Sequence, residues 1–390
     1  MMDYGKLLSQ KIVDVKPSGI RRFFDIAGEM EGVISLGVGE PDFKTPYQIR
    51  RAAIESLGRG RTWYTANAGM PILKDEISKY MKRRFNLSYD PSEELFVTVG
   101  GSEAIDMCIR CLVNPGDEVL VVEPSFVCYK PIAEVSGAVA IPIATRVEDD
   151  FRLTPELLRA ALTSKTKLLI LPFPANPTGA VMKREHLEAI AEVLRGTDVM
   201  VLSDEIYAEL SYGEERHVSI AELPDMWERT IVVNGFSKAY AMTGWRLGYA
   251  CGPAPVIEQM VKLHQYAIMC APTTSQFAAI EAMRSCDEAI AEMKNEYNMR
   301  RRIVVDRLNR MGLTCFEPEG AFYVFPNITS TGYGSEEFCQ KLLCSKKVAV
   351  VPGDAFGDCG EGFVRISYSY SMEHLLTAMD LIEAFIHEPR

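Results

Sequence analysis

The chain has 390 residues, of which 47% are hydrophobic and 24% are charged, and its formal net charge is −11. This length and composition predict a globular protein with a sizeable core divided between two domains, and they disfavour an intrinsically disordered chain. The negative charge disfavours non-specific binding to nucleic acid or to anionic membranes, because phosphate binding needs clustered Lys and Arg side chains. We therefore expect small-molecule chemistry, with neither nucleic acid nor membrane as a partner.

Residues 1–45 are too few and too irregular for a domain, so we expect an N-terminal arm that packs on the rest and partly joins the smaller domain. They contain no unbroken apolar stretch of the signal-peptide kind, which favours a cytoplasmic location. The ten cysteines are scattered through the chain, and we expect them to be reduced. Cys108 and Cys111 form a C-x-x-C pair on a predicted helix, where helix packing is favoured over a redox or zinc role.

Residues 46–283 are predicted to form a large α/β domain. From about residue 95 to 250, short β-rich runs alternate with amphipathic stretches at 154–162 and 183–195, which is typical of a mainly parallel sheet covered by helices. The predicted strands are LFVTVG, EVLVVE, KLLILPF, VMVLSDE, TIVVNGF and GYACGP. Apolar runs of this length are far below the ~18 residues that a membrane span needs.

The pattern changes over residues 284–390. A long charged helix is predicted from about Met283 through Arg310, followed by shorter strands around 321–325 and 363–367 and by a closing helix. This alternation predicts a smaller α+β domain.

The stretch NGFSKAYAMTGWRLG places Ser237, Lys238 and Arg246 in one loop just beyond a predicted strand end. Open α/β sheets bind ligands at the carboxyl ends of their strands. A Lys in such a place, partly desolvated and close to cations, has a lowered pKa and can form an imine with an aldehyde. Arg246 supplies a permanent cation for a phosphate dianion. The alternative for each residue alone is a solvated surface charge, which is the commoner situation.

Asp204 ends the largely apolar run VLSD, where an unpaired carboxylate would be costly. A protonated pyridine nitrogen would be a suitable cationic partner, because the pair keeps the ring an electron sink. Tyr207 follows closely enough to hydrogen-bond the phenolic oxygen of such a ring. The alternative is that Asp204 caps a following helix.

Two glycine-containing turns follow other predicted strands. In PANPTG the amide of Asn176 can donate to a phenolate oxygen, although a bare turn explains the composition as well. In GGSEA the backbone N–H groups of Gly101 and Ser102 can hold a phosphate at a helix start, and a purely steric role of the glycines is the alternative. The run GVGEPD has Asp42 where a dinucleotide-binding loop needs its last Gly, so we exclude that type of site.

Together these motifs resemble those of the class I and II aminotransferases of pyridoxal phosphate fold type I, over essentially the whole chain. The resemblance rests on eight stretches in the family's order: ISLGVGEPDF, YTANAG, GGSEAI, NPTGA, SDEIYAEL, NGFSKAYAMTGWRLGY, GAFYVFP and GEGFVRISY. It implies an α/β fold in which a large domain, with a mainly parallel seven-stranded sheet between helices, is joined to a smaller α+β domain.

The resemblance also implies pyridoxal 5′-phosphate as the cofactor, bound through a Schiff base to Lys238, whose amine then acts as the general acid–base catalyst. Asp204 matches the residue that faces the pyridine nitrogen, and Asn176 and Tyr207 match the pair on the phenolic oxygen. The residues that match phosphate contacts are Gly101, Ser102, Ser237 and Arg246.

Four further residues match positions of the family. Phe126 would stack on the pyridine ring, with core packing as its alternative. Arg365 would bind the substrate α-carboxylate with two parallel bonds, and Gly39 would add its backbone N–H. Tyr64 would reach the cofactor phosphate of the other subunit. The resemblance therefore implies a homodimer with shared sites.

The implied reaction is a ping-pong transfer of an amino group from an L-amino acid to a 2-oxoacid such as 2-oxoglutarate. The segment at residues 18–28, together with the SKAYAMTGWRLGY stretch, resembles the bacterial and archaeal subgroup of aromatic, aspartate and N-acetyl-diaminopimelate aminotransferases, so we expect an aromatic or acidic donor. Arg21 or Arg22 could bind a side-chain carboxylate, and an exposed arm pair is the favoured alternative.

Two other functions stay open at this point. A C–S β-lyase is possible on the same fold, because the same carbanion can expel a leaving group. A non-catalytic regulator that binds pyridoxal phosphate would need an effector region such as a helix-turn-helix, for which the arm is too short and not basic enough.

Overall fold

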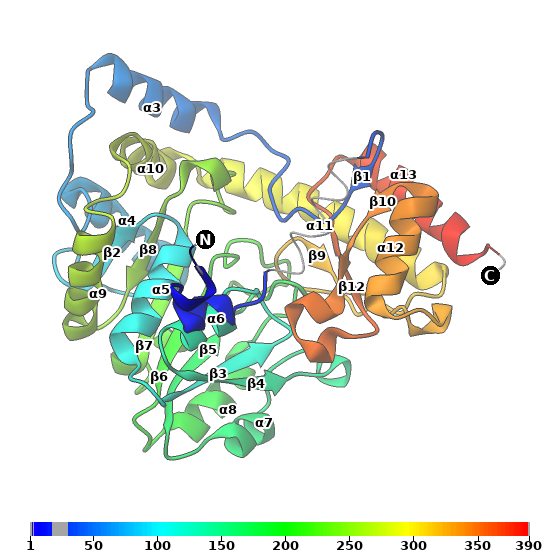
Figure 1. Cartoon of the computed structure of the whole chain (residues 1–390). Coiled ribbons are helices and arrows are strands. Elements are labelled where there is room, and N and C mark those ends of the chain that lie inside the picture. Colours follow the sequence, from blue (N-terminus) through cyan, green and yellow to red (C-terminus); the bar gives the residue numbers. More distant parts are fainter. Residues whose placement is uncertain (1, 3, 18–29, 389–390) are drawn as a thin grey trace.

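The computed structural model describes residues 2, 4–17 and 30–388. A seven-stranded sheet of order β2-β8-β7-β6-β5-β3-β4 forms its centre (Figure 1). β8 runs antiparallel to β2 and β7, and the other neighbouring strands are parallel, so the predicted mainly parallel seven-stranded sheet is confirmed. The strands are β2 (Leu95–Thr98), β3 (Glu118–Glu123), β4 (Val139–Ala144), β5 (Thr166–Leu171), β6 (Met200–Asp204), β7 (Thr230–Gly235) and β8 (Gly248–Cys251).

Helices cover both faces of this sheet, because alternate side chains of its strands are apolar on both sides. Leu168 and Ile170 of β5 belong to a core with α5, α6 and α9, whereas Leu169 and Leu171 belong to a core with α7 and α8. On this second face, α4 and α10 cover the β2–β8 edge, and α3 packs against α10. These helices are α3 (Tyr47–Gly58), α4 (Pro71–Phe85), α5 (Gly101–Leu112), α6 (Tyr129–Val135), α7 (Pro155–Ala161), α8 (Arg184–Leu194), α9 (Ala254–Ala267) and α10 (Thr273–Ser285).

β4 is absent from the predicted strands. It pairs with β3 alone at the edge of the sheet and contains Pro142, a residue that edge strands tolerate because one side of the backbone needs no partner. Val139 is 49% exposed, and most other side chains of this strand are exposed or half-buried. Because β4 lies at the edge, it has no continuous run of buried apolar residues from which the strand could be predicted.

The C-terminal part has its own core around a three-stranded sheet of order β11-β12-β9. The predicted long charged helix and the two later strands are confirmed as α11, β9 and β12. The elements here are α11 (Asp287–Arg310), β9 (Tyr323–Val324), α12 (Ser335–Lys346), β10 (Val348–Ala349), β11 (Val351–Pro352), β12 (Val364–Ser367) and α13 (Met372–Ile386). β1 (Ile34–Ser35) pairs with β10 in parallel. The division of the chain at residues 45/46 and 283/284 stays a prediction.

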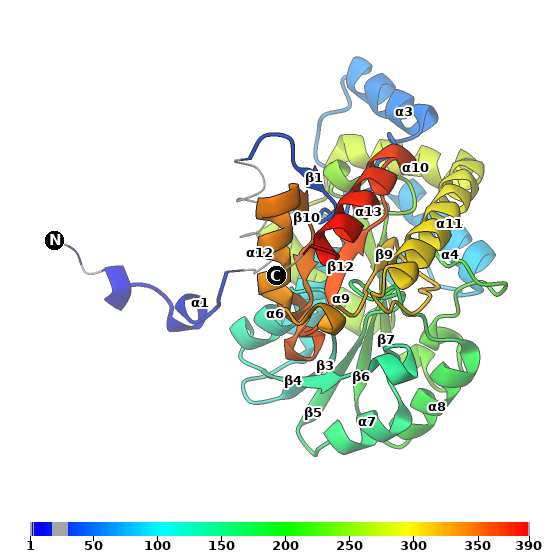
Figure 2. The same ribbon diagram turned by 90° about the vertical axis from the view of Figure 1, so that its right-hand side faces the viewer.

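The N-terminal segment extends away from the rest of the ribbon in Figure 2. It contains a 3-10 turn (Tyr4–Lys6) and α1 (Gln10–Val13), and the large apolar side chains Leu7, Leu8 and Ile12 are 63%, 59% and 58% exposed. Within the described ranges, none of the helices combines the length and apolar character of a membrane span. All ten cysteines are free thiols.

Candidate active site

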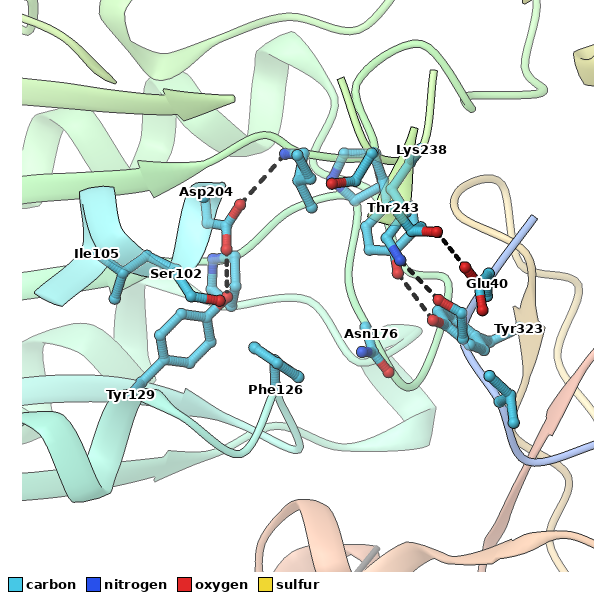
Figure 3. A pocket seen from close by; sticks show the side chains of 18 of the residues that line it. Glu40, Ser102, Ile105, Phe126, Tyr129, Asn176, Asp204, Lys238, Thr243 and Tyr323 are labelled. Atoms are coloured by element: carbon cyan, nitrogen blue, oxygen red, sulfur yellow. Dashed lines mark hydrogen bonds between the residues drawn. The ribbon is translucent and has the colours of Figure 1, made fainter. Parts of the chain in front are cut away.

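The carboxyl ends of β3, β5, β6 and β7 face the C-terminal part across a cavity of about 500 Å³. Strand ends converge here because neighbouring parallel strands all finish at the same edge of the sheet. Figure 3 shows the polar side chains that point into this cavity. The predicted site residues that line it are Gly39, Gly101, Ser102, Phe126, Asn176, Asp204, Tyr207, Ser237, Lys238, Arg246 and Arg365.

Lys238 lies in the turn that follows β7. Its Nζ donates to the carbonyl oxygen of Gly39 at 2.6 Å and lies 5.7 Å and 5.6 Å from the ring centroids of Tyr207 and Phe322. The pKa of Lys238 is lowered to about 8, mainly by burial; the negative charge of Glu40 opposes the shift and the positive charge of Arg365 contributes to it. A larger fraction of this amine is therefore neutral and nucleophilic near pH 7 than in an ordinary lysine.

Asp204 is the last residue of β6, and its side chain is buried. The Tyr129 hydroxyl donates to Oδ2 at 2.7 Å, and the Ile206 N–H donates to Oδ1 at 3.2 Å (Figure 3). Burial raises the pKa of Asp204 to about 6, because the charged form is desolvated. The bond to Ile206 lies within a turn rather than at the start of a helix, so the alternative role as a helix cap is not what the structure shows.

An anion-binding corner lies where α5 begins. Gly100 has a φ of 78°, and α5 starts at Gly101 without a side-chain cap, which leaves backbone N–H groups of its first turn pointing outward. The exposed Arg246 lies beside this turn, and a Cβ on Gly100 would come within 2.6 Å of its Nη2 atom. Gly100 therefore allows a cation to lie close to the positive end of a helix.

Arg365 on β12 is the most enclosed cation of the site. Its guanidinium carbon lies 4.6 Å from the ring centroid of Tyr323 and 4.8 Å from that of Phe356, so two aromatic rings contact the group. Nη1 donates to Asn176 Oδ1 at 2.8 Å, and Nη2 donates to the carbonyl oxygen of Gly37. Within the described ranges Nε has no hydrogen-bond partner, and burial lowers the pKa of the group. A buried cation in this state is suited to binding a carboxylate.

Tyr207 and Asn176 approach the cavity from two different strand ends. The hydroxyl groups of Tyr207 and Tyr323 are 2.8 Å apart, so one donates to the other and the second proton can go elsewhere. The Asn176 oxygen accepts from Arg365, so the amide NH₂ group, which has no acceptor among the described residues, can donate to a ligand.

Of the other predicted residues, Phe126 and Ser237 lie at the site and Tyr64 does not. Phe126 lines the cavity and makes an edge contact with the Tyr129 ring, with centroids 6.1 Å apart. Ser237 lines the same cavity and is buried. Tyr64 does not line it: this side chain is 77% exposed and borders a separate surface hollow together with Trp63. Arg21 and Arg22 lie outside the described residues.

Sequence reasoning missed Tyr129, Tyr323 and Phe356. Tyr129 follows Phe126 by three residues, so the run EPSFVCY carried a signal for it. Tyr323 lies within the GAFYVFP stretch, and its hydroxyl occupies the space that a Cβ on Gly39 would need. Phe356 has no comparable signal, because only the tertiary fold brings it to Arg365.

Comparison with known proteins agrees with this geometry. The family described as aminotransferase class I and II matches residues 31–382. The relative YugH of Bacillus subtilis (strain 168), named as an aminotransferase, is 51% identical over 381 residues, which are 98% of each chain. The aspartate aminotransferase of Pyrococcus abyssi is 46% identical over 98% of this chain and 99% of its own.

Solved structures of aminotransferases have the same fold as this chain. A crystal structure of the aromatic aminotransferase from Pyrococcus horikoshii OT3 matches with a TM-score of 0.89 and 43% identity, over 94% of this chain and 98% of that chain. The chain therefore belongs to the class I and II aminotransferases, enzymes that use pyridoxal phosphate to move an amino group from an amino acid to a 2-oxoacid.

Proposed function

We propose that this enzyme takes the amino group of an aromatic or acidic L-amino acid and passes it to a second 2-oxoacid such as 2-oxoglutarate, in two half-reactions of ping-pong type. The observation that carries the proposal is the meeting of Lys238, Asp204 and Arg365 at one cavity. They supply an amine of lowered pKa, a buried carboxylate and a buried guanidinium. The Pyrococcus relatives, one named for aspartate and one for aromatic substrates, support this donor class.

The cavity fits pyridoxal phosphate at several points. The first turn of α5 and Arg246 would hold the phosphate, with Ser102 and Ser237 close by. Asp204 would face the ring nitrogen, because a buried carboxylate gains most from a cationic partner. When bound, the group supplies an aldehyde that condenses with an amine and a ring that withdraws electrons from the substrate α-carbon.

Other side chains would act on the ring oxygen and the ring face. Tyr207 can donate its proton to the phenolic oxygen when Tyr323 donates to Tyr207, and the free NH₂ of Asn176 can donate to the same atom. Phe126, on the loop after β3, would cover one face of the ring. These contacts would orient the reacting atom toward Lys238.

We assign proton movement at the substrate α-carbon to Lys238. Its lowered pKa keeps both the neutral and the charged form accessible near neutral pH, which is what a group that first takes and then returns a proton requires. Arg365 would hold the α-carboxylate, and its aromatic neighbours limit the guanidinium to one orientation. The carbonyl oxygen of Gly39 accepts a hydrogen bond from Lys238, and the N–H of Gly39 would donate to the substrate carboxylate.

A homodimer with shared sites is part of the proposal. Tyr64 and Trp63 are 77% and 61% exposed, and Tyr266 is 88% exposed, which supports a covering second copy. The exposed apolar side chains of the N-terminal arm support the same assembly. Tyr64 would then reach the phosphate site of the neighbouring subunit, and a cytoplasmic location stays a prediction.

The test is a scan of single half-reactions. The purified enzyme with bound cofactor is mixed with one amino acid at a time, and loss of the visible absorption band and formation of the 2-oxoacid are recorded. Aromatic amino acids, aspartate or glutamate are expected to convert the band, and the order of rates identifies the donor. Release of pyruvate and ammonia from cysteine conjugates, without conversion by amino acids, would assign a β-lyase instead. A band that no amino acid changes would indicate a non-catalytic protein.

A further inference from the structure

We infer that Tyr129 is a positioning residue for Asp204, whose carboxylate it holds ionised and in the orientation that meets the ring nitrogen of the cofactor. The inference rests on the proposed function, in which Asp204 faces that nitrogen. It concerns a side chain that would act through Asp204 rather than on the cofactor itself.

The geometry fixes both oxygens of the carboxylate. Tyr129 is the first residue of α6, is 2% exposed, and packs in the core between the sheet and α5. Its hydroxyl lies 2.7 Å from Asp204 Oδ2, while the Ile206 N–H lies 3.2 Å from Oδ1 (Figure 3). One donor on each oxygen prevents rotation of the group, and the remaining lone pairs are available toward the cavity.

The Tyr129 hydroxyl also favours the ionised form of Asp204. Burial raises the pKa of Asp204, and the hydrogen bond from Tyr129 is the largest influence that lowers it again. Besides the Ile206 N–H donor, the titratable groups that act on this carboxylate in the described part of the chain include Glu205, Lys238, Cys128 and Tyr207. Burial and the nearby carboxylate raise the pKa of Tyr129 well above its usual value, so the phenol stays protonated and can only donate to Asp204.

One loop would also couple two functions of the ring pocket. Phe126 lies in the loop between β3 and α6, Tyr129 is the first residue of α6 directly after this loop, and their rings meet edge to face at an interplanar angle of 82°. A shift of this loop would move the side chain on the ring face and the donor to Asp204 together. The competing explanation is that Tyr129 only fills the core. A test must therefore distinguish the loss of the hydroxyl from the loss of packing.

Tyr129→Phe keeps the ring and removes only the hydroxyl. In the enzyme with bound cofactor, the pH midpoint of the visible band is expected to rise by about one unit, because a less protonated ring nitrogen withdraws less charge from the group bonded to Lys238. The dissociation constant of the cofactor is expected to rise about tenfold, since a hydrogen bond to a charged group is lost. kcat should fall about tenfold while KM for the amino acid changes little, because the substrate does not contact this residue.

Tyr249→Phe is the matched control. Its phenol is buried too, but its hydroxyl contacts the sulfur of Met81 at 3.5 Å and lies outside the site. Both variants should lose similar thermal stability, and only Tyr129→Phe should move the pH midpoint. In an Asp204→Asn background, Tyr129→Phe should add no further shift. Equal midpoints and cofactor affinities for Tyr129→Phe and wild type would overturn the inference.

A second substitution guards against a variant that folds poorly. Site-specific incorporation of 3-fluorotyrosine at position 129 retains the hydroxyl and makes it a stronger donor, so the midpoint should move in the opposite direction. No movement in either variant would overturn the role. If wild type fails to react with amino acids while the midpoints still differ as expected, the proposed transamination fails and the positioning role stands.

Discussion

Arg365 shows how a single residue can be held ready for a ligand by neighbours that carry no charge. The rings of Tyr323 and Phe356 both lie within 5 Å of its guanidinium carbon, at 4.6 Å and 4.8 Å, and Asn176 and Gly37 accept from its two terminal nitrogens. A flat guanidinium suits this arrangement, because it stacks on rings and still presents N–H groups in its own plane. A lysine ammonium could satisfy neither the stacking nor the paired bonds.

Arg365→Lys is therefore expected to lower kcat/KM for the amino acid about 100-fold, because a bidentate charged contact is lost. Half-reaction kinetics measure this loss, and the dissociation constant of maleate, an unreactive dicarboxylate, checks that binding is the cause. Arg310→Lys serves as the control, since this exposed side chain pairs with Asp306 on the surface and has no place in the cavity. Similar kinetics for the two variants would contradict the assignment of Arg365.

Lys238 gives a prediction about pH. Because burial lowers its pKa from 10.5 to about 8, half of the amine should be neutral at about pH 8 and nearly all of it about one pH unit higher. The rate at which cofactor-free enzyme bonds pyridoxal phosphate covalently should therefore level off above about pH 9. Stopped-flow absorbance measures this rate. A rate that continues to increase up to pH 10, as for a free lysine, would contradict the lowered pKa.

The sequence predicted most of these residues because they lie in local motifs at strand ends. Asp204 ends a buried strand, Lys238 follows the next one, and Arg365 lies within FVRIS, so each could be placed from its neighbours in the chain. The partners that orient them could not be placed in this way. Phe356 reaches Arg365, and Tyr129 reaches Asp204, only after distant elements pack together.

At the level of elements, the turn between β2 and α5 combines strain with function. Gly100 has a φ of 78°, which side chains with a Cβ seldom adopt, and it leaves room for Arg246 beside the first turn of the helix. Edge strands are harder to predict from the sequence than buried strands. β4 was not predicted because an edge strand can contain exposed residues and a proline. β1, β10 and β11 contain only two residues each, which is too short for a recognisable pattern.

Comparison of Gly100→Ala with Gly116→Ala should separate the effect of backbone strain from the effect of displacing Arg246. Both glycines have positive φ, 78° and 91°, but a Cβ on Gly116 meets no atom within 4 Å, whereas one on Gly100 meets Arg246. Each variant should lose about 1 kcal/mol of unfolding free energy, measured in urea, because of backbone strain. Only Gly100→Ala should also bind pyridoxal phosphate about tenfold more weakly, since its cation is displaced. Unchanged cofactor affinity in Gly100→Ala would argue against a phosphate site here.

At the level of the whole molecule, the cavity combines parts that are far apart in the chain. The sheet contributes Asp204 and Lys238, while Arg365 comes from the C-terminal part and Gly39 from the segment after β1. The large exposed aromatic side chains Trp63, Tyr64 and Tyr266 lie outside this cavity. One chain therefore accounts for the amine, the carboxylate partner and the guanidinium, whereas the role of Tyr64 at the site of a second copy stays a prediction.

Hybrid dimers can test that role. If Tyr64 serves the neighbouring site, a dimer of one Lys238→Ala chain and one Tyr64→Ala chain contains one site with both residues intact and one site with neither. Such a dimer, isolated with two different affinity tags, should show about half of the wild-type activity per dimer, whereas both parent dimers should be much less active. If Tyr64 serves its own chain, each site of the hybrid lacks one residue, and no activity should be regained beyond the mean of the parents. Recovery thus distinguishes a shared site from an independent one without requiring the Tyr64→Ala parent to be fully inactive.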